Sequence, residues 1–291
     1  MLQWELETKN KFWVNFFRLT RPLSNVKNIA IIAFASYLSG AKLNWGLFIL
    51  GALAMSLIFS AIYAYNTVCD ADSDKTNKNK RHYSEAAQYF GKNKLFWIKI
   101  ILAASGLALG LCVNIYFFSS LVALLLIGFL YSSPHTRFRE RIFLDVLFGA
   151  TLTFLFRFVA AWFIFKISFP PLLPMFALVF LKNGGYMLYQ EYDRQFLMER
   201  GIKNSITVLP KMTVLVISAV FSALSIVLFA ILCLFGPLPL GFLWLLPLFA
   251  PPILVNYLLF FKKIKISVRR MRAVGFSLLL LLIAIILLML R

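Results

Sequence analysis

Acidic side chains are scarce in this sequence, which has 11 Asp and Glu against 30 Lys and Arg in 291 residues. Only 14% of the chain is charged, whereas 61% is hydrophobic and 31 residues are phenylalanine. Soluble globular domains carry charge on about a quarter of their residues. The low charge therefore argues against an ordinary soluble domain and indicates lipid as the solvent.

Cysteine and histidine are too few to form the sites that these residues usually build. Cys69, Cys112 and Cys233 are widely separated, which argues against a disulfide framework and against a zinc site. His82 and His135 lie far apart in predicted polar loops, so we expect surface positions rather than metal ligation. The opening residues contain no signal-peptide apolar core, and we expect them to belong to the mature protein.

Apolar runs fill most of the chain, with lengths near the roughly 20 residues that a helix needs to cross about 30 Å of hydrocarbon. The expected spans are 22–42, 46–68, 95–111, 114–131, 143–165, 171–190, 213–235, 240–261 and 271–290. They predict an all-α polytopic membrane protein of about nine transmembrane helices. The helices are expected to form one bundle and a single domain over residues 1–291, with a polar cleft that faces the cytoplasm.

The net charge of +19 would suggest nucleic acid in a soluble protein, but the basic residues gather in alternate connections. This distribution predicts orientation in a membrane, with no nucleic-acid partner. The positive-inside rule places the N-terminus and the acidic helix ends in the cytoplasm, and the C-terminus outside the cell (inner) membrane. Residues 1–20, which include Trp4, Trp13 and Phe17, are expected to form an interfacial segment.

The second expected helix ends in an acidic stripe formed by Asn66, Asp70 and Asp74. Residues four apart are neighbours on a helix, so the three side chains can point into one cleft. Carboxylate and amide oxygens suit Mg²⁺ better than zinc or copper. The alternative is a solvated helix end whose acids are neutralised by the following lysines and arginine.

The sixth expected helix leaves the membrane on the same side and carries Tyr189, Gln190 and Asp193. Two polar clusters would therefore share one face of the bundle. Taken alone, a single acidic residue at a helix end is more often a solvated surface charge.

The two clusters resemble the motifs of the UbiA superfamily of intramembrane prenyltransferases. The first is Asn66-x-x-x-Asp70-x-x-x-Asp74-Lys75-x-Asn77-Lys78-x-x-Arg81, and Arg18-Leu19-Thr20-Arg21-Pro22 and Tyr131-Ser132-Ser133-Pro134 occur in the family's order. The sequence departs from the family at Thr67 and His82 in the first motif, where Asp and Pro are usual. In the second motif, Leu197 and Asn204 replace an Asp and a Thr.

The resemblance implies a prenyl diphosphate donor and a hydrophobic or aromatic acceptor in the lipid bilayer. Mg²⁺ would join the diphosphate to Asn66, Asp70 and Asp74 on one side and to Asp193 on the other, which makes the three aspartates catalytic. Glu191 or Glu199 could stand in for the carboxylate missing at Leu197. The remaining residues expected to bind substrate are Arg21, Lys75, Arg81, Tyr131, Arg137, Arg157, Tyr189, Gln190 and Lys203.

Other reactions remain open at this point. Relatives with similar frameworks transfer phosphoribose or hydrate and cyclise terpenoids, and a transporter is the alternative of a different class. Transporters usually place ionisable residues near the membrane midplane within repeated halves, and no internal repeat is evident here. Pro247, Pro251 and Pro252, which would kink the eighth helix, keep the transporter alternative open.

Arg157 is expected deep in the bilayer, about 21 Å from the cytoplasmic end of its helix. Lys27 and Lys182 lie closer to the inner face and can extend toward it. A guanidinium in lipid is unfavourable by about 2.5 kcal/mol or much more, so Arg157 should face the bundle interior. Its expected partners are neutral acceptors or an anionic substrate group.

Overall fold

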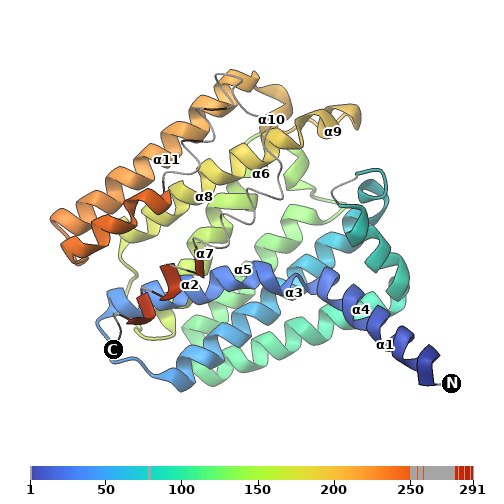
Figure 1. Ribbon diagram of the computed structural model, residues 1–291, viewed down its shortest axis with the longest axis horizontal. Coiled ribbons are helices and arrows are strands. Elements are labelled where there is room, and N and C mark those ends of the chain that lie inside the picture. The colour runs from blue at the N-terminus through green and yellow to red at the C-terminus, as the bar shows by residue number, and fades with distance from the viewer. Residues whose placement is uncertain are drawn as a thin grey trace.

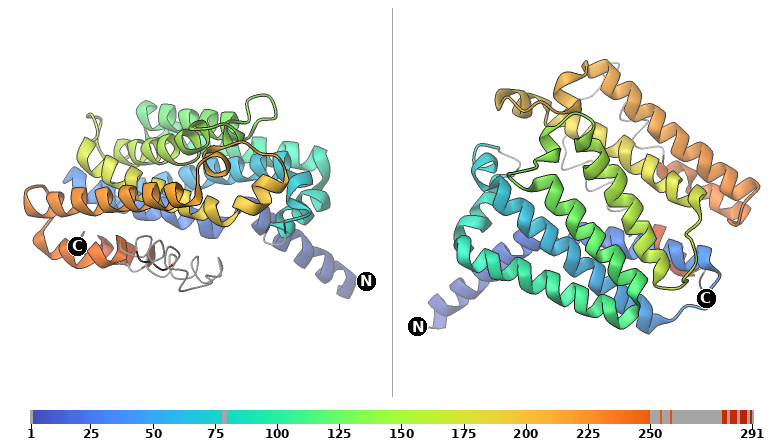
Figure 2. Two further views of the ribbon diagram at one scale, coloured as in Figure 1. Left: turned by 90° about the horizontal axis from the view of Figure 1, so that it is seen from above. Right: turned by 180° about the vertical axis from the view of Figure 1, so that it is seen from behind.

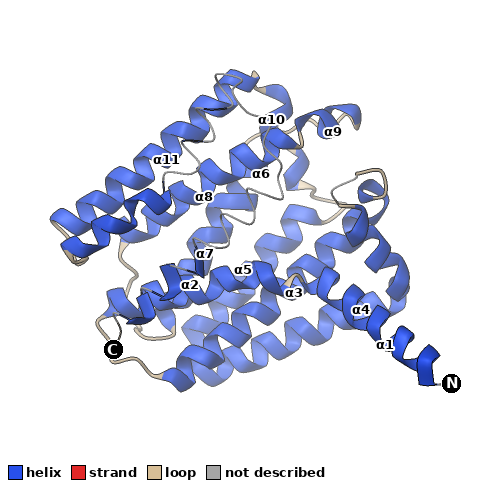
Figure 3. Ribbon diagram, viewed as in Figure 1, coloured by secondary structure: helices blue, strands red, loops and turns tan. Residues whose placement is uncertain are grey.

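The computed structural model describes residues 2–77 and 80–249, together with single positions and short stretches between 254 and 290. All regular elements in the described part are helices (Figure 3). They are α1 (Leu2–Thr20), α2 (Pro22–Ser39), α3 (Trp45–Asp74), α4 (Arg81–Val113), α5 (Ile115–Ser132), η1 (Phe138–Glu140), α6 (Leu144–Val146), η2 (Leu147–Thr151), α7 (Leu152–Phe163), α8 (Leu172–Tyr192), α9 (Arg194–Glu199), α10 (Ser205–Val208), α11 (Lys211–Leu234) and η3 (Leu240–Phe249).

Six helices are long and apolar enough to cross a membrane. They are α3, α4, α5, the continuous segment Leu144–Phe163, α8 and α11. Helix α2 matches the first expected span in position, but polar residues such as Asn25, Lys27 and Asn28 occupy its first half. The expected spans 240–261 and 271–290 are described only in part, the first as the 3₁₀ helix η3, so the total of about nine helices stays a prediction.

Helix α4 begins at Arg81 rather than at the expected residue 95, which leaves only a short connection after α3. Its first part is amphipathic, and Ala87 and Phe90 pack in one cluster with Leu19 of α1. The Ser84 hydroxyl also donates to the Ala71 carbonyl oxygen at 2.7 Å, which fixes this part of α4 on α3. Hydropathy misses the segment because its exposed face is polar.

Gly91 divides α4 into two parts. Its backbone adopts a left-handed φ of 69°, which an L side chain rarely tolerates. The helix therefore bends at the point where a polar, surface-lying part meets the apolar part that follows.

The polar segments gather at one end of the bundle. Helix α1, the α3–α4 connection, α9 and α10 lie toward the same end in Figure 1, and the reverse view in Figure 2 agrees. The connections at 40–44 and 164–171 lie at the opposite end. From α2 onward, successive long helices thus alternate in direction, as the expected order of spans requires, and the ends of α3 and α8 meet on one face.

Helices α8 and α11 lie side by side (Figure 1) and approach closely because small residues line their contact. Hydroxyls of Ser218 and Ser225 donate to the carbonyl oxygens of Gly184 and Ala177, both at 2.7 Å. A Cβ atom on Gly184 would lie 2.9 Å from the Ser218 carbonyl oxygen. In lipid, such small-residue packing and interhelical hydrogen bonds replace the hydrophobic effect between helices.

We therefore expect Gly184→Ala to destabilise the protein by about 1–3 kcal/mol, because the added methyl group must push α8 and α11 apart. Gly185→Ala is the matched control, since nothing lies within 4 Å of a Cβ at that position. Thermal unfolding of the two purified variants measures the difference. Equal melting temperatures would contradict the close approach of the two helices.

Candidate active site

The acidic stripe predicted at the end of α3 is present and faces the bundle. Helix α3 has 30 residues and is about 45 Å long, so its last turns extend beyond about 30 Å of hydrocarbon. Asp74 is buried with 6% of its surface exposed, whereas the side chain of the intervening Asp72 is 97% exposed. The Asn66 Oδ1 atom is buried and has no hydrogen-bond partner in the described part of the chain. Asn66 thus presents an acceptor that a ligand could use.

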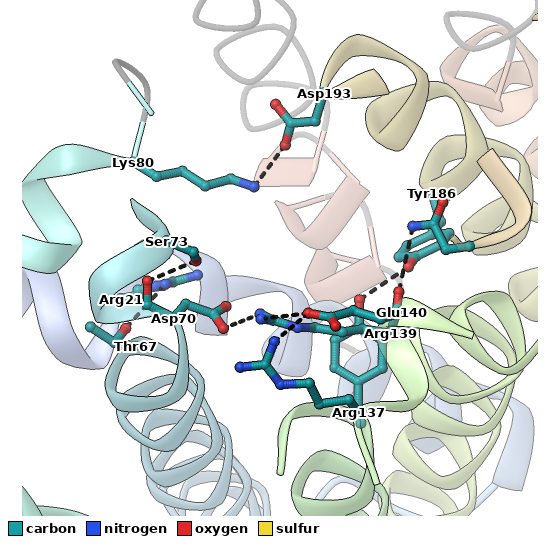
Figure 4. Close-up of polar contacts among 12 residues, drawn as sticks. Arg21, Thr67, Asp70, Ser73, Lys80, Arg137, Arg139, Glu140, Tyr186 and Asp193 are labelled. Carbon is teal, nitrogen blue, oxygen red and sulfur yellow. Dashed lines mark hydrogen bonds and ion pairs between the residues drawn. The ribbon is translucent and has the colours of Figure 1, made fainter. Parts of the chain in front are cut away.

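Two ion pairs connect the stripe and the end of α8 to basic side chains (Figure 4). Arg139, from η1, pairs with Asp70, and both side chains are largely buried. Lys80, from the α3–α4 connection, lies 2.7 Å from Asp193, which is 5% exposed. The polar cluster thus joins residues more than 100 positions apart in the sequence.

The pKa values of the two cations follow from this pairing. Burial lowers the pKa of Lys80, but Asp193, Tyr189 and Asp74 together outweigh burial and raise the pKa above its ordinary value. Burial also lowers the pKa of Arg139, and the combined attraction of Asp70, Tyr131 and Glu140 outweighs it and raises that pKa. Both side chains therefore remain charged at neutral pH.

Arg21 forms the third cationic contact of the site, at the junction between α1 and α2. Its Nη2 donates to the Thr67 hydroxyl at 3.2 Å, and its guanidinium lies 3.7 Å from the centre of the Tyr83 ring. The charges of Arg21, Lys80 and Arg139 all act on Asp74. Three carboxylates and three cations therefore share the site, which is close to neutral without a ligand.

Backbone strain concentrates around this end of the bundle. Arg21, Arg137 and Phe143 are the non-glycine residues with positive φ in the described segments, at 49°, 42° and 65°. Such conformations are unfavourable by about 1–3 kcal/mol each and often occur at functional sites. Arg21 itself joins α1 to α2, Arg137 directly precedes η1 with Arg139, and Phe143 directly precedes α6.

Tyrosines and a π-helical turn form the wall beside the ion pairs. The hydroxyls of Tyr131 and Tyr186 lie 3.0 Å apart, and Gln190 contacts Tyr186. Element η2 is π-helical, and a Cβ on its Gly149 would lie 2.8 Å from the Tyr131 ring. Glycine at this position therefore lets the two tyrosines meet, and π turns of this kind are frequent at functional sites.

The other residues that the sequence predicts to bind substrate have different partners from one another in the structure. Tyr189 is half-buried next to Lys80. Lys75 pairs with Asp72 at 3.0 Å, and Arg81 pairs with Glu85 at 3.3 Å, so both contact acids outside the central cluster. Arg137 pairs with Glu140 at 2.7 Å, and Lys203 is exposed.

Glu191 and Glu199, the two suggested replacements for the second-motif carboxylate, both have hydrogen-bond partners near them in the sequence. Arg194 holds both carboxylate oxygens of Glu191, at 2.8 and 2.9 Å. Glu199 is exposed and accepts from Gln195 at 3.0 Å. Asn204, at the position of the family's Thr, instead caps α10 by accepting from the backbone of Ile206 and Thr207.

Lys80 and Arg139 are the central residues that the sequence argument did not select. Both belong to basic stretches of the sequence, and Arg137, the residue predicted to bind substrate, lies only two positions from Arg139. The tertiary structure decides between them, because both arginines pair with Glu140 but Arg139 also pairs with Asp70.

A metal ion here would rest on oxygen donors. The described residues contain no group of three His, Cys, Asp or Glu side chains already arranged around a metal position. The carboxylates of Asp70 and Asp193 are engaged by cations, while Asn66 Oδ1 is unpartnered. An oxygen-only set of this kind fits Mg²⁺, provided that the two cations release their carboxylates.

The fold and the sequence pattern both match known proteins. The pattern of the UbiA prenyltransferase family matches residues 28–281. A UbiA homologue from Archaeoglobus fulgidus bound to GPP and Mg²⁺ is 20% identical, with 95% of this chain and 99% of that chain covered and a TM-score of 0.79. The apo structure of a UbiA homologue from Aeropyrum pernix K1 is 18% identical, with coverage of 91% and 97% and a TM-score of 0.74.

A third solved structure, of a digeranylgeranylglyceryl phosphate synthase, is 17% identical, with coverage of 96% and 97% and a TM-score of 0.65. A search of curated protein sequences found no match. At these identities the structural likeness establishes the fold, whereas the sequence pattern establishes the family.

We expect Lys80→Met to destabilise the protein by about 1–3 kcal/mol, because Asp193 would remain buried without its charged partner. Lys92→Met is the control, since Lys92 is exposed on α4. Chemical or thermal unfolding at neutral pH compares the two variants. If Lys80→Met is no more destabilising than Lys92→Met, the ion pair does not hold the α3–α4 connection on α8.

Proposed function

Because the chain belongs to the UbiA prenyltransferase family, we propose that it transfers a prenyl group from a prenyl diphosphate to a lipophilic or aromatic acceptor within the membrane. The observation that carries this proposal is the meeting of Asp70, Asp74 and Asp193 from two helix ends with Lys80 and Arg139. The UbiA homologue from Archaeoglobus fulgidus, which shares the fold, binds GPP and Mg²⁺.

Mg²⁺ is the cofactor in this proposal. When bound, it would be held by Asn66, Asp70, Asp74 and Asp193 and would neutralise negative charge on the diphosphate. The buried acceptor of Asn66 and the oxygen-only donor set support this assignment.

The two ion pairs give the site a way to receive an anion and a metal together. We propose that Arg139 and Lys80 move from their carboxylates to phosphate oxygens when the substrate enters, while the carboxylates become free for the metal. Arg21, which already faces the same cluster, would contact the diphosphate as well. Every charge then keeps a partner of opposite sign throughout.

Transfer breaks the bond between the first prenyl carbon and its oxygen, and the diphosphate leaves with the electron pair. The nucleophilic atom of the acceptor bonds to that carbon and then gives a proton to solvent. Charge grows on the leaving group, where the positioned cations stabilise it. The rings of Tyr131 and Tyr186, beside the ion pairs, can stabilise positive charge on the allylic carbon.

We also propose that residues 1–291 form one domain of the cell (inner) membrane, with α1 at the interface and the site facing the cytoplasm. The exposed Phe12, Trp13 and Phe17 on α1 support an interfacial position. The six apolar helices establish an integral membrane protein of this family.

Incubation of the purified protein with Mg²⁺, a labelled prenyl diphosphate and a panel of acceptors tests the reaction. We expect diphosphate release that depends on both Mg²⁺ and an acceptor, with the label recovered in a larger product. Absence of release and product with every donor length and acceptor would contradict prenyl transfer and favour a different UbiA reaction or transport.

We expect Asp70→Asn and Asp74→Asn each to abolish turnover, because each removes a charged metal ligand. Asp74→Asn should change thermal stability little, whereas Asp70→Asn should lower it by about 1–3 kcal/mol because the buried Arg139 loses its aspartate partner. Asp72→Asn is the matched control on the same turn, since its side chain is 97% exposed. Turnover and melting temperature are measured on all three variants. Near-wild-type turnover in stable Asp70→Asn or Asp74→Asn protein would contradict the metal assignment.

We expect Mg²⁺ to bind weakly without the diphosphate. Leu197 stands where the family has a carboxylate, Glu191 is held by Arg194, and two of the remaining carboxylates are paired with cations. Calorimetric titration of the substrate-free protein measures the affinity. Tight binding of two Mg²⁺ ions would show that the ion pairs do not compete with the metal.

A further inference from the structure

Two buried polar residues, Asn204 and Ser205, contact the loop that carries Arg139. The Ser205 hydroxyl donates to Asp145 Oδ1 at 2.6 Å and accepts from the Phe143 backbone N–H at 2.8 Å. The side-chain amide of Asn204 donates to the Arg139 carbonyl oxygen at 3.4 Å. Asp145 is 0% exposed, and Asn204 and Ser205 are each 2% exposed. We call Asn204, Ser205 and Asp145 the loop anchor.

The loop anchor is itself attached to two long helices. Ser205 is the first residue of α10, and Asn204 caps that helix. The next residue, Ile206, is 0% exposed and belongs to one hydrophobic cluster with Met187 of α8 and Val214 of α11. The packing of α8 and α11 therefore sets the position of Ser205 independently of the loop that Ser205 contacts.

The loop buries little apolar surface where it meets the anchor. The Phe143 side chain is 74% exposed and that of Ile142 is 39% exposed. The backbone of Phe143 has a φ of 65°, which is unfavourable for a residue other than glycine. Such a conformation persists only where surrounding contacts hold it. The hydrogen bond from the Phe143 N–H to Ser205 is one such contact, and it comes from outside the loop.

Arg139 must be placed accurately, because each of its roles requires direct contact. Without a ligand it pairs with Asp70, and both side chains are largely buried (Figure 4). In the proposed function it then moves to a phosphate oxygen. A displacement of about 1 Å far from the reacting atoms can lower a rate about 10²-fold when it misplaces such a group. The backbone from which Arg139 extends is therefore as important as its charge.

We propose that the loop anchor positions Arg139 for its pair with Asp70 and for contact with the diphosphate. The diphosphate part of this inference rests on the proposed function. Asn204, Ser205 and Asp145 are then positioning residues that act through Arg139. Asp145 Oδ1 is occupied by Ser205, whereas Oδ2 is buried without a hydrogen-bond partner in the described part of the chain. A direct role of the Asp145 charge is therefore the alternative that the experiments separate.

The first experiment needs no ligand. A double-mutant cycle of Arg139→Met and Asp70→Asn in equilibrium unfolding measures the coupling of the ion pair. We expect a smaller coupling in a Ser205→Ala background, because the loop no longer holds Arg139 against Asp70. Ser225→Ala is the matched background and should leave the coupling unchanged, since its buried hydroxyl also donates at 2.7 Å, but to Ala177. Equal coupling in the wild-type and Ser205→Ala backgrounds, or an equal loss in Ser225→Ala, would overturn the inference.

The second experiment measures binding of inorganic pyrophosphate by calorimetry, without Mg²⁺. Arg139→Met should weaken binding by about tenfold or more, as loss of a hydrogen bond between charged groups predicts. Ser205→Ala should weaken binding by roughly threefold or more, but it should cause no further loss in Arg139→Met protein. A residue that acts only through Arg139 has no effect once Arg139 is absent. Additive losses would show that Ser205 acts by another route and would overturn the inference.

Asp145→Asn separates the hydrogen bond from the charge. The amide oxygen of the variant can still accept from Ser205, so we expect the ion-pair coupling and the pyrophosphate affinity to stay near their wild-type values. Losses as large as those in Ser205→Ala would assign a direct role to the Asp145 charge and overturn the positioning role.

The outcomes also separate this inference from the proposed function. The expected change in coupling, in a protein that transfers no prenyl group, would overturn the proposed function alone. Prenyl transfer with unchanged coupling in Ser205→Ala would overturn the inference alone. If the wild-type protein does not bind pyrophosphate, the coupling measurement still decides whether the loop anchor positions Arg139.

Discussion

The pairing of buried carboxylates with buried cations is the interaction on which this end of the molecule depends. Asp70 would repel Asp74 on the same helix face if no cation stood against them, and Asp193 would be a lone charge in a largely dry environment. Arg139 and Lys80 remove both problems. The first pair joins η1 to α3, and the second joins the α3–α4 connection to α8. The same two ion pairs therefore neutralise the acids and hold these four segments together.

The bundle interior holds its cations by a different interaction. The Arg157 guanidinium lies 3.7 Å from the ring centre of Phe59, and the Lys182 ammonium lies 5.7 Å from that of Tyr186. The negative face of an aromatic ring attracts a cation where water is scarce. Carboxylates thus hold the cations at the helix ends, whereas aromatic rings contact those of the interior.

Small residues set the geometry between these regions. Gly184 and the serines of α11 bring α8 and α11 together, and Gly149 lets Tyr131 and Tyr186 meet beside the ion pairs. In each case the absence of a side chain allows an approach that a methyl group would block. Gly149 belongs to the π-helical turn η2, and π turns of this kind are frequent at functional sites.

The sequence by itself determined the helical class, the positions of most spans and the acidic faces at the ends of α3 and α8. Hydrophobic length and four-residue spacing are local properties, and lipid imposes helical structure on any long apolar run. The start of α4 was missed because an amphipathic segment at a membrane surface lacks such a run.

Only the tertiary structure decided which cations meet the acids. Arg137 and Arg139 belong to the same basic stretch of the sequence and share Glu140 as a partner, but Arg139 also pairs with Asp70. The tertiary structure also places the Lys182 ammonium 5.7 Å from the ring centre of Tyr186, whereas the sequence allows this side chain to extend toward the membrane surface. Contacts between residues far apart in sequence depend on how helices pack, and hydropathy and spacing carry no information about which helix faces which.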